Sequence, residues 1–371
     1  MINNRNYGLD TLRSLAIILV FMFHCFMYSK SPLLTSIGHV GWVGVDLFFV
    51  LSGYLIGNQI FSALKKQNFS LKMFYMRRFL RTLPNYFIVL ALYFLIPSFR
   101  ELPLTTPLWK FMTFTQNFGL SVSAFSHAWS LCIEEQFYFM LPIVLLLVIY
   151  KKALRLGWFL IGALLIGEML LRGTLWLHYI QHAGDNTFKL YMTNLYYPSF
   201  SRLDGLILGV AIAMVRNFHE ETWARITNKG NWWMLFGIIG CYFTFYSLDH
   251  LYSFMPTTFG FLFRAISFSA LVIAALSPDS VLNRTKIPGA MTLATWSYAI
   301  YLIHKPLIHV TRLALSYWGI GESSVFSTAL EIMVTLAGGW LLYTFIENPF
   351  LRLRDKMTES HRLPLELAQT R

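Results

Sequence analysis

The sequence predicts an all-α protein, a polytopic transmembrane helical bundle of about ten spans with both termini in the cytoplasm. Three observations lead to this prediction. Hydrophobic residues make up 56% of the 371 residues and charged residues only 13%, whereas soluble domains carry about 25% charged residues. The apolar residues gather in long runs, and Lys and Arg gather in every second connection between the runs.

The apolar runs approach or exceed the length that crosses a bilayer, about 20 residues. The ten expected spans are 9–28, 41–62, 82–97, 128–150, 157–179, 200–216, 231–248, 259–276, 290–315 and 325–347. Because basic loops stay in the cytoplasm, the basic connections after every second span place both termini there. The same distribution explains the net charge of +12 without any nucleic-acid partner.

The chain is expected to form one transmembrane domain over residues 1–355, followed by a polar, loosely ordered cytoplasmic tail at 356–371. The longest outer connection, 98–127, is expected to be re-entrant or interfacial. The first apolar run is too long for a signal peptide and lacks a small-residue cleavage site, so we expect it to stay.

Metal and disulfide chemistry are not indicated. The cysteines lie in apolar segments at unrelated spacings, and no pair of His, Asp or Glu residues has convincing metal-ligand spacing. These cysteines are Cys25, Cys132 and Cys241.

The first span holds two ionisable residues, Arg13 and His24. Eleven positions correspond to three helical turns plus roughly 20°, so both lie on one face, about 16 Å apart along the axis. Ionisable groups are costly in a bilayer and therefore indicate a pathway or a site. The alternative is that Arg13 snorkels to the interface and His24 bonds a neighbouring helix.

The second span carries Asp46, and its glycines Gly44, Gly53 and Gly57 allow close helix approach. A carboxylate at that depth needs a partner, and a cation on the first span is the nearest candidate in sequence. A structural Asp–Arg pair and direct catalysis are both open.

A basic connection at 74–84 contains Arg77, Arg78 and Arg81. Membrane topology alone explains arginines there. The more specific hypothesis is an anion site, because guanidinium groups bind phosphates with two hydrogen bonds. No Walker loop or dinucleotide fingerprint is present.

The fourth span opens with adjacent carboxylates, Glu134 and Glu135. They differ by about 100° around the helix, so both cannot face one cavity squarely. One is free to act at a site while the other pairs with an arginine. Charge pairing alone explains either residue.

The fifth and sixth spans also carry charges. Glu168 and Arg172 are spaced i, i+4 and are expected to pair structurally. Arg202 and Asp204 open the sixth span, where they either bind a substrate or face water.

The ninth span places Tyr298, Tyr301 and Lys305 on one face, with His304 beside it. Tyr and His suit hydroxyl-rich ligands, but they also join neighbouring helices in many membrane proteins.

Together, these segments resemble the acyltransferase-3 family of integral-membrane acyltransferases over about residues 9–353. The resemblance rests on seven motifs in order. They are LDTLR (9–13) with His24 after ten intervening residues, GVDLFFVLSG (44–53), RRFLRTLP (77–84), WSLCIEEQFY (129–138), RLDGL (202–206), SYAIYLIH (297–304) and IENPF (346–350).

The resemblance implies transfer of an acyl group, usually acetyl, from cytoplasmic acyl-CoA to a hydroxyl of an extracytoplasmic glycan. Such acceptors include O-antigen (the outer part of lipopolysaccharide), exopolysaccharide and other cell-envelope polysaccharides, often lipid-linked, at the bacterial inner membrane. Acetyl-CoA is then a substrate, and no permanently bound cofactor or metal is expected. The chain is expected to be the membrane-only form, without the extra hydrolase-like domain of some relatives. Oligomeric state stays open.

The resemblance also marks the Arg13/His24 pair as functional, and the chemistry and placement of the residues suggest individual roles. His24 is the expected general base, because its unperturbed pKa near 6.5 suits deprotonation of a hydroxyl; an acyl-histidine intermediate is the alternative. Arg13 holds the thioester or orients an acidic partner, and Glu134 or Glu135 orients the imidazole. The remaining expectations are CoA phosphate binding by Arg77, Arg78 and Arg81, support by Asp10, Asp46 and Ser52, and acceptor binding by Trp129, Ser130, Tyr138, Arg202, Asp204, Tyr298, Tyr301 and His304.

Two alternatives stay open at this stage. A proton-coupled transporter or glycolipid flippase would also contain buried Asp, Glu, Arg and His, although no inverted halves are visible. An acyltransferase acting on a small molecule such as a macrolide would share the same donor chemistry.

Overall fold

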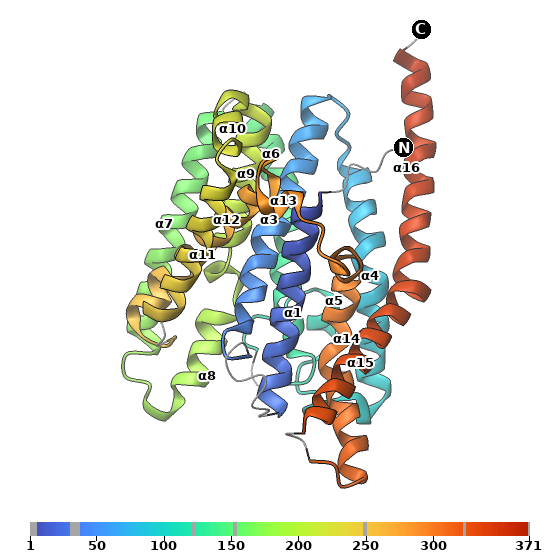
Figure 1. Cartoon of the computed structure of the whole chain (residues 1–371). Helices are drawn as coiled ribbons and strands as arrows, with labels where there is room; N and C mark the ends of the chain where they lie inside the picture. The colour runs from blue at the N-terminus through green and yellow to red at the C-terminus, as the bar shows by residue number, and fades with distance from the viewer. Residues whose placement is uncertain are drawn as a thin grey trace.

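The computed structural model describes residues 6–29, 38–120, 123–150, 154–247, 251–321 and 324–369, and these contain helices but no strand. Long helices pack side by side in one bundle (Figure 1). The helices are α1 (Tyr7–Ser29), α3 (Gly44–Lys65), α4 (Leu71–Leu95), α5 (Leu108–Met112), α6 (Trp129–Tyr150), α7 (Leu154–Tyr179), α8 (Thr187–Tyr191), α9 (Asp204–Phe218), α10 (Glu220–Thr227), α11 (Gly230–Ser247), α12 (Phe261–Leu276), α13 (Val281–Arg284), α14 (Ala290–Tyr317), α15 (Val325–Leu342) and α16 (Asn348–Gln369). The all-α prediction is confirmed.

Within the described residues, six helical segments are long and apolar enough to cross a membrane. They are Tyr7–Met27, Gly41–Lys65, Ser126–Leu147, Leu154–Tyr179, Pro256–Leu276 and Val325–Thr358. Helices also overlap the other predicted ranges, in α4, α9, α11 and α14. The chain is a multi-pass membrane protein, while the count of ten spans and the cytoplasmic side of the termini stay predictions.

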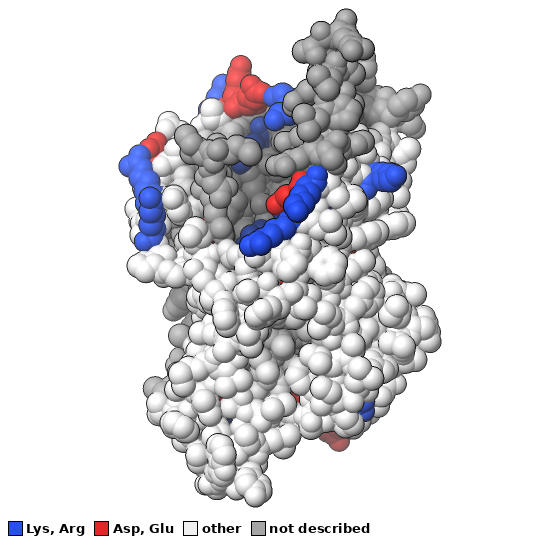
Figure 2. Space-filling view, turned by 90° about the vertical axis from the view of Figure 1, so that its right-hand side faces the viewer, with Lys and Arg blue, Asp and Glu red and all other residues white. Residues whose placement is uncertain are grey.

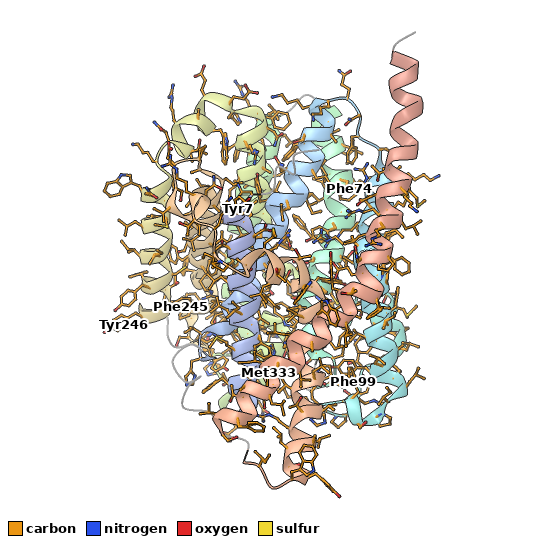
Figure 3. The ribbon with its side chains drawn as sticks, turned by 45° about the vertical axis from the view of Figure 1, so that its right-hand side comes forward. Tyr7, Phe74, Phe99, Phe245, Tyr246 and Met333 are labelled. Carbon is orange, nitrogen blue, oxygen red and sulfur yellow. The ribbon has the colours of Figure 1, made fainter. Side chains whose placement is uncertain are left out.

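The surface of the bundle suits contact with lipid. On the face shown in Figure 2, charged side chains gather toward the upper end and the lower half is almost free of them. On α11, Tyr242 and Tyr246 are 69% and 77% exposed, and Tyr246 projects from the edge of the bundle (Figure 3). Water does not favour such large exposed apolar faces, whereas lipid does.

Glycines bring the central helices into backbone contact. A Cβ added to Gly53 of α3 would lie 2.1 Å from the carbonyl oxygen of Leu206 in α9, and one added to Gly44 would lie 2.4 Å from that of Ala16 in α1. Only residues without a side chain permit this approach. The expectation of close packing at these glycines is confirmed, and it brings α1 and α9 directly against α3.

Two expectations about local structure are wrong, whereas the division into a domain at 1–355 and a cytoplasmic tail stays a prediction. Helix α4 begins at Leu71, where the Ser70 hydroxyl accepts a hydrogen bond from the backbone N–H of Met73 at 3.3 Å. The arginines of 77–84 therefore lie on a helix rather than in a loop, and Pro84 sits inside that helix. The described part of the polar tail is helical rather than loosely ordered: α16 continues to Gln369 and projects beyond the upper end of the bundle (Figure 1).

The connection 98–127 is folded against the bundle. It contains α5, and the side chains of Phe111 and Phe125 are completely buried in the hydrophobic core. It ends in a short turn, Ser126–Ala128, that leads directly into α6. This turn positions His127 and Ser126 beside α14.

Candidate active site

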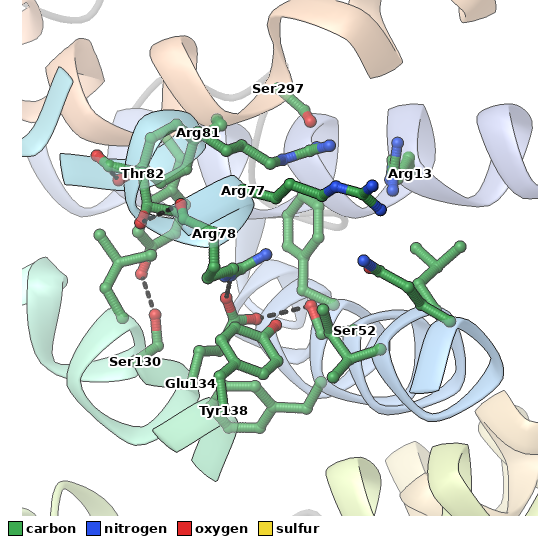
Figure 4. A pocket seen from close by; sticks show the side chains of 18 of the residues that line it. Arg13, Ser52, Arg77, Arg78, Arg81, Thr82, Ser130, Glu134, Tyr138 and Ser297 are labelled. Atoms are coloured by element: carbon green, nitrogen blue, oxygen red, sulfur yellow. Dashed lines mark hydrogen bonds and ion pairs between the residues drawn. The ribbon is translucent and has the colours of Figure 1, made fainter. Parts of the chain in front are cut away.

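A first cavity of about 440 Å³ lies between α1, α3, α4, α6, α14 and α16. Its described lining contains five arginines and two carboxylates. These are Arg13, Arg77, Arg78, Arg81 and Arg354, with Glu134 and Asp355. In Figure 4, Arg13 of α1 and Arg77 and Arg81 of α4 point into the same space. The excess of positive charge makes this cavity suited to an anion.

Arg78 is held on one wall of this cavity. Its Nε lies 3.4 Å from Oε1 of Glu135, one of its terminal nitrogens lies 3.9 Å from Oε2 of Glu134, and its guanidinium lies 3.7 Å from the ring centre of Tyr138. Both ion-pair distances exceed the roughly 2.7–2.9 Å of a charge-assisted hydrogen bond. Arg78 is thus oriented without being fully bonded, which leaves it able to bind an added anion.

The two glutamates differ as their helical positions predict. Glu134 lines the cavity and accepts a hydrogen bond from the Ser52 hydroxyl at 2.8 Å, whereas Glu135 reaches Arg78 from outside the lining. The single arginine therefore contacts both carboxylates, although only one of them faces the cavity.

A second cavity, of about 630 Å³, lies toward the other end of α1. His24, His39 and His127 line it, and its described lining contains no Asp or Glu. Aromatic side chains from several elements form much of its wall. They include Trp42, Trp129, Tyr196, Tyr197 and Tyr252. Aromatic walls with a few polar groups are typical of small-molecule and cofactor sites.

The two cavities share part of their walls. Val45 of α3 and Tyr301 of α14 line both. The Tyr301 hydroxyl donates to the backbone carbonyl of His127 at 2.6 Å and lies 2.6 Å from the hydroxyl of Ser130. Arg13 and His24, on one stripe of α1, therefore open into different cavities on either side of this shared wall.

The contacts of the His24 imidazole indicate which of its nitrogens carries the hydrogen. Its Nδ1 lies 2.9 Å from the backbone carbonyl of Val20 and 3.1 Å from Nε2 of His304. A carbonyl oxygen only accepts, so we assign the single hydrogen to Nδ1, shared between the Val20 carbonyl and Nε2 of His304, and the lone pair to Nε2 of His24. A lone pair on Nε2 is what a general base requires.

Neither glutamate of α6 orients His24. Glu134 and Glu135 are held by Ser52 and Arg78, as described above, and the Nδ1 atom of His24 is bonded by Val20 and His304 instead. The predicted carboxylate–imidazole contact is therefore wrong, because the glutamates lie at the first cavity and the imidazole at the second.

The prediction that a cation on the first span pairs with Asp46 is also wrong. Its two carboxylate oxygens bond Arg202 at 2.5 Å and Arg264 at 3.0 Å, not a cation of the first span. The Arg202 guanidinium packs 4.1 Å from the ring centre of Phe261 and is only 2% exposed. This cluster is buried and fixes α3 against α9 and α12.

A second buried pair joins α7 to α9. Arg172 donates two hydrogen bonds to the carboxylate of Asp204, at 2.7 and 3.0 Å. The predicted i, i+4 contact with Glu168 exists at 3.8 Å, but Glu168 also accepts from the backbone N–H of Leu203 at 2.8 Å. Arg172, Glu168 and Asp204 form one buried network.

The residues expected to bind an acceptor fall into separate groups. Trp129 lines the second cavity, and Tyr301 lines both. Ser130, Tyr138 and Tyr298 line the first cavity, with the arginines. The other three lie outside both described linings: Arg202 and Asp204 in the buried ion pairs, and His304 behind His24. Asp10 is buried near the start of α1.

Sequence reasoning missed three residues that line these cavities and one carboxylate that pairs with Lys305. Arg264 and His127 line the second cavity, Arg354 lines the first, and Glu101 forms a 2.9 Å ion pair with Lys305. Glu101 and His127 lie in a connection whose polar residues look like surface residues in the sequence. Arg264, an arginine inside an apolar span, was the one available signal.

Comparison with known proteins identifies the family. A family model described as an acyltransferase domain, acyltransferase-3, matches residues 6–344. The chain belongs to the acyltransferase-3 family. No solved structure matches this acyltransferase-3 chain.

Curated relatives of this acyltransferase-3 chain are O-acetyltransferases. It is 29% identical over 365 residues to the peptidoglycan O-acetyltransferase OatA of Listeria monocytogenes, covering 92% of the chain and 55% of the relative. It is 26% identical over 371 residues to the O-acetyltransferase OatA of Staphylococcus aureus, covering 92% of the chain and 56% of the relative. The chain thus spans about half the length of these relatives.

Proposed function

We propose that this acyltransferase moves an acetyl group from acetyl-CoA to a hydroxyl of an extracytoplasmic glycan in the cytoplasmic membrane of a bacterium. The family and the names of its relatives support acyl transfer over transport. Peptidoglycan, the glycan named for the Listeria relative, is the first acceptor to test, before lipid-linked saccharides or small molecules such as macrolides.

The donor side of the proposal rests on the first cavity. Arg77, Arg78 and Arg81 bind the phosphates of CoA, since guanidinium groups pair with phosphate oxygens and this cavity holds few carboxylates. Arg13 lines the same cavity and lies on the face of α1 that also carries His24. It holds the thioester end of acetyl-CoA. The pantetheine arm extends toward the wall formed by Val45 and Tyr301.

The acceptor side rests on the second cavity. A sugar ring packs on the aromatic walls, and its hydroxyl lies at Nε2 of His24. Nε2 takes the hydroxyl proton as the oxygen attacks the thioester carbon. The C–S bond then breaks, the thiolate of CoA receives that proton from the imidazolium, and an ester and free CoA leave. No redox step is involved.

The shared wall is the observation that supports this proposal most directly. The arginine cavity and the imidazole cavity meet at Val45 and Tyr301. A donor and an acceptor that reach the bundle from opposite ends therefore approach each other beside His24. This arrangement suits transfer across a membrane without transport of the intact donor.

The test measures free CoA and ester formation by the purified chain in lipid nanodiscs, with acetyl-CoA and peptidoglycan fragments or an envelope-glycan extract. His24→Ala is compared with His178→Ala, which removes an exposed imidazole on α7 outside both described linings. We expect product from the parent and from His178→Ala, and a loss of about 100-fold or more in His24→Ala.

Equal CoA release by the His24→Ala variant would remove His24 as base or nucleophile. An inactive parent with every glycan tested would overturn the proposed acetyl transfer. A covalent acetyl group trapped on His24 by rapid quenching would replace the general-base step with an acyl-histidine intermediate.

A further inference from the structure

His304 lies directly behind His24 and outside the described lining of both cavities. It is completely buried on α14, and its ring centre lies 4.8 Å from that of His24. Its Nε2 lies 3.1 Å from Nδ1 of His24. A buried histidine in this position has no direct access to a substrate, so any role in the reaction is exerted through His24.

The backbone of α14 fixes the hydrogen of His304. Its Nδ1 lies 2.7 Å from the carbonyl oxygen of Tyr301 and 3.2 Å from that of Ile300. Since these oxygens only accept, Nδ1 of His304 carries the hydrogen and its Nε2 is an acceptor. That acceptor faces the Nδ1–H of His24. The two rings therefore form a directed pair in which His24 donates, its one Nδ1–H being shared between Nε2 of His304 and the Val20 carbonyl.

The reverse direction is excluded by the same contacts. If Nε2 of His304 donated to His24, Nδ1 of His24 would present a lone pair to the Val20 carbonyl at 2.9 Å. A neutral His304 would then also present a lone pair to the Tyr301 carbonyl at 2.7 Å. Two such repulsions in a buried site are costly. Only one direction satisfies all the polar atoms.

We propose that His304 is a positioning residue that fixes the tautomer and orientation of His24, keeping the Nε2 lone pair available in the second cavity. This inference rests on the proposed function. It replaces the carboxylate of more familiar acid–base pairs with a neutral imidazole whose direction is fixed by backbone carbonyls. Sequence analysis assigned His304 to acceptor binding, which its burial contradicts.

The surroundings of the pair contain two further basic groups. The His127 ring centre lies 5.1 Å from that of His304, and Lys305 follows on the same helix. Lys305 is bonded by Glu101 at 2.9 Å and by the Ser126 hydroxyl at 3.2 Å. Among the described residues, no group of three or more His, Cys, Asp and Glu has an arrangement that would hold a metal. His24 and His304 are hydrogen-bonded to each other, whereas His127 bonds the backbone carbonyl of Leu302 at 3.1 Å.

Two amide substitutions separate positioning from general structural support. In His304→Gln, the side-chain amide reaches the place of Nε2 and its oxygen accepts from His24. In His304→Asn, the shorter amide lies near the place of Nδ1, so it keeps the bond to the Tyr301 carbonyl and loses the bond to His24. Both variants replace the imidazole with the same polar group.

We expect His304→Asn to lower kcat by about 10–100-fold, by analogy with partners that orient metal-bound histidines, with KM for acetyl-CoA nearly unchanged. His304→Gln should keep kcat within about threefold of the parent. Equal kcat losses in the two variants, or a loss carried mainly by KM, would overturn the positioning role.

A second measurement is independent of turnover. In histidine-labelled protein in nanodiscs, 15N spectra should show His24 with a protonated Nδ1 and an unprotonated Nε2, and a coupling across the hydrogen bond to Nε2 of His304. His304→Asn should remove that coupling. A His24 protonated at Nε2 in the parent would contradict the inference even if the parent proves inactive, whereas inactivity with the expected spectrum would affect only the proposed reaction.

Discussion

Two sets of arginine–carboxylate contacts in this bundle look alike in the sequence and differ in the structure. Around Asp46, the contacts to Arg202 and Arg264 are 2.5 and 3.0 Å long. Around Arg78, the contacts to Glu135 and Glu134 are 3.4 and 3.9 Å long, and Arg78 opens into a cavity. The first set is closed in the sense that both carboxylate oxygens of Asp46 are bonded directly, although Arg264 also lines the second cavity, whereas the second set leaves Arg78 open to a further partner.

The difference teaches how to separate structural from functional charges in a membrane bundle. Burying an ion pair is costly unless the partners bond well, and the Asp46 cluster meets that requirement with aromatic rings packed on both guanidinium groups. The Arg78 contacts do not. An arginine whose carboxylate partners lie beyond hydrogen-bond distance can still form charge-assisted hydrogen bonds with an anionic ligand.

The largest effect should come from breaking the closed set. Asp46→Asn leaves Arg202 and Arg264 buried without their anion, and removing one member of a buried ion pair costs about 3–5 kcal/mol. We expect a much lower melting temperature and a poor yield of folded protein. The measurement is thermal unfolding in detergent.

The control for Asp46→Asn is Asp355→Asn, because the Asp355 carboxylate is 63% exposed and pairs with the adjacent Arg354. This variant should melt with the parent. If Asp46→Asn also melted with the parent, the closed set would not be structural and the comparison above would fail.

A smaller effect, confined to ligand binding, should follow from breaking the open set. Arg78→Gln removes charge-assisted hydrogen bonds to the CoA phosphates, worth about 1.5–3 kcal/mol, so affinity for acetyl-CoA should fall about 10–100-fold. The melting temperature should change far less than in Asp46→Asn. Affinity is measured by equilibrium binding of acetyl-CoA to the purified protein in nanodiscs.

Arg225→Gln is the matched control for Arg78, since Arg225 is 82% exposed and outside both described cavity linings. It should bind acetyl-CoA like the parent. Unchanged affinity in Arg78→Gln, tested alone and with Arg81→Gln, would place the CoA phosphates elsewhere.

The helices were predictable because lipid leaves the backbone no other way to satisfy its hydrogen bonds. Apolar runs therefore indicated helices at all the predicted ranges. The sequence also predicted that Arg13 and His24 share one face of a helix, since that relation depends only on their spacing within α1. The start of α4 was not predictable in this way, because Arg77, Arg78 and Arg81 interrupt the apolar run although the helix continues through them.

Partners across the bundle were not predictable from one sequence. Asp46 bonds residues 156 and 218 positions away, and His24 bonds a residue 280 positions away. Such pairs depend on which helices the glycines bring together, as at Gly53 and Leu206. Span periodicity gives the face on which a charge lies, but not the helix that it meets.

The ion pair between Glu101 and Lys305 offers an intermediate case, because it is direct but lies near His24, the proposed general base. Glu101→Gln removes the counter-charge of Lys305, so an imidazolium that forms on His24 faces an uncompensated ammonium. We expect kcat to fall about tenfold, corresponding to about 1.4 kcal/mol, with little change in KM for acetyl-CoA.

Steady-state kinetics of a double variant test the cause of that loss. Glu101→Gln combined with Lys305→Met removes both charges, so kcat should recover relative to Glu101→Gln alone. Losses that simply add would mean that the two residues act independently, and the proposed charge compensation would be wrong.

The smallest effect is expected for an ion pair that is neither buried nor beside a cavity. Lys65 and Glu220 are 53% and 75% exposed, outside the predicted spans, and Lys65 lowers the pKa of Glu220 by donating a hydrogen bond. A lowered carboxyl pKa contributes stability above its usual range that is lost as the pH falls through the lowered value. At an exposed site this contribution is small.

Glu220→Gln should therefore melt within error of the parent at pH 7, and the two proteins should converge further as the pH falls. The measurement is thermal unfolding at several pH values. The substitution is chemically identical to Glu101→Gln, so contrasting outcomes would show that burial, and not the type of charge, decides its effect. A destabilisation of Glu220→Gln comparable to that of Asp46→Asn would contradict this, because exposed and buried ion pairs would then contribute alike.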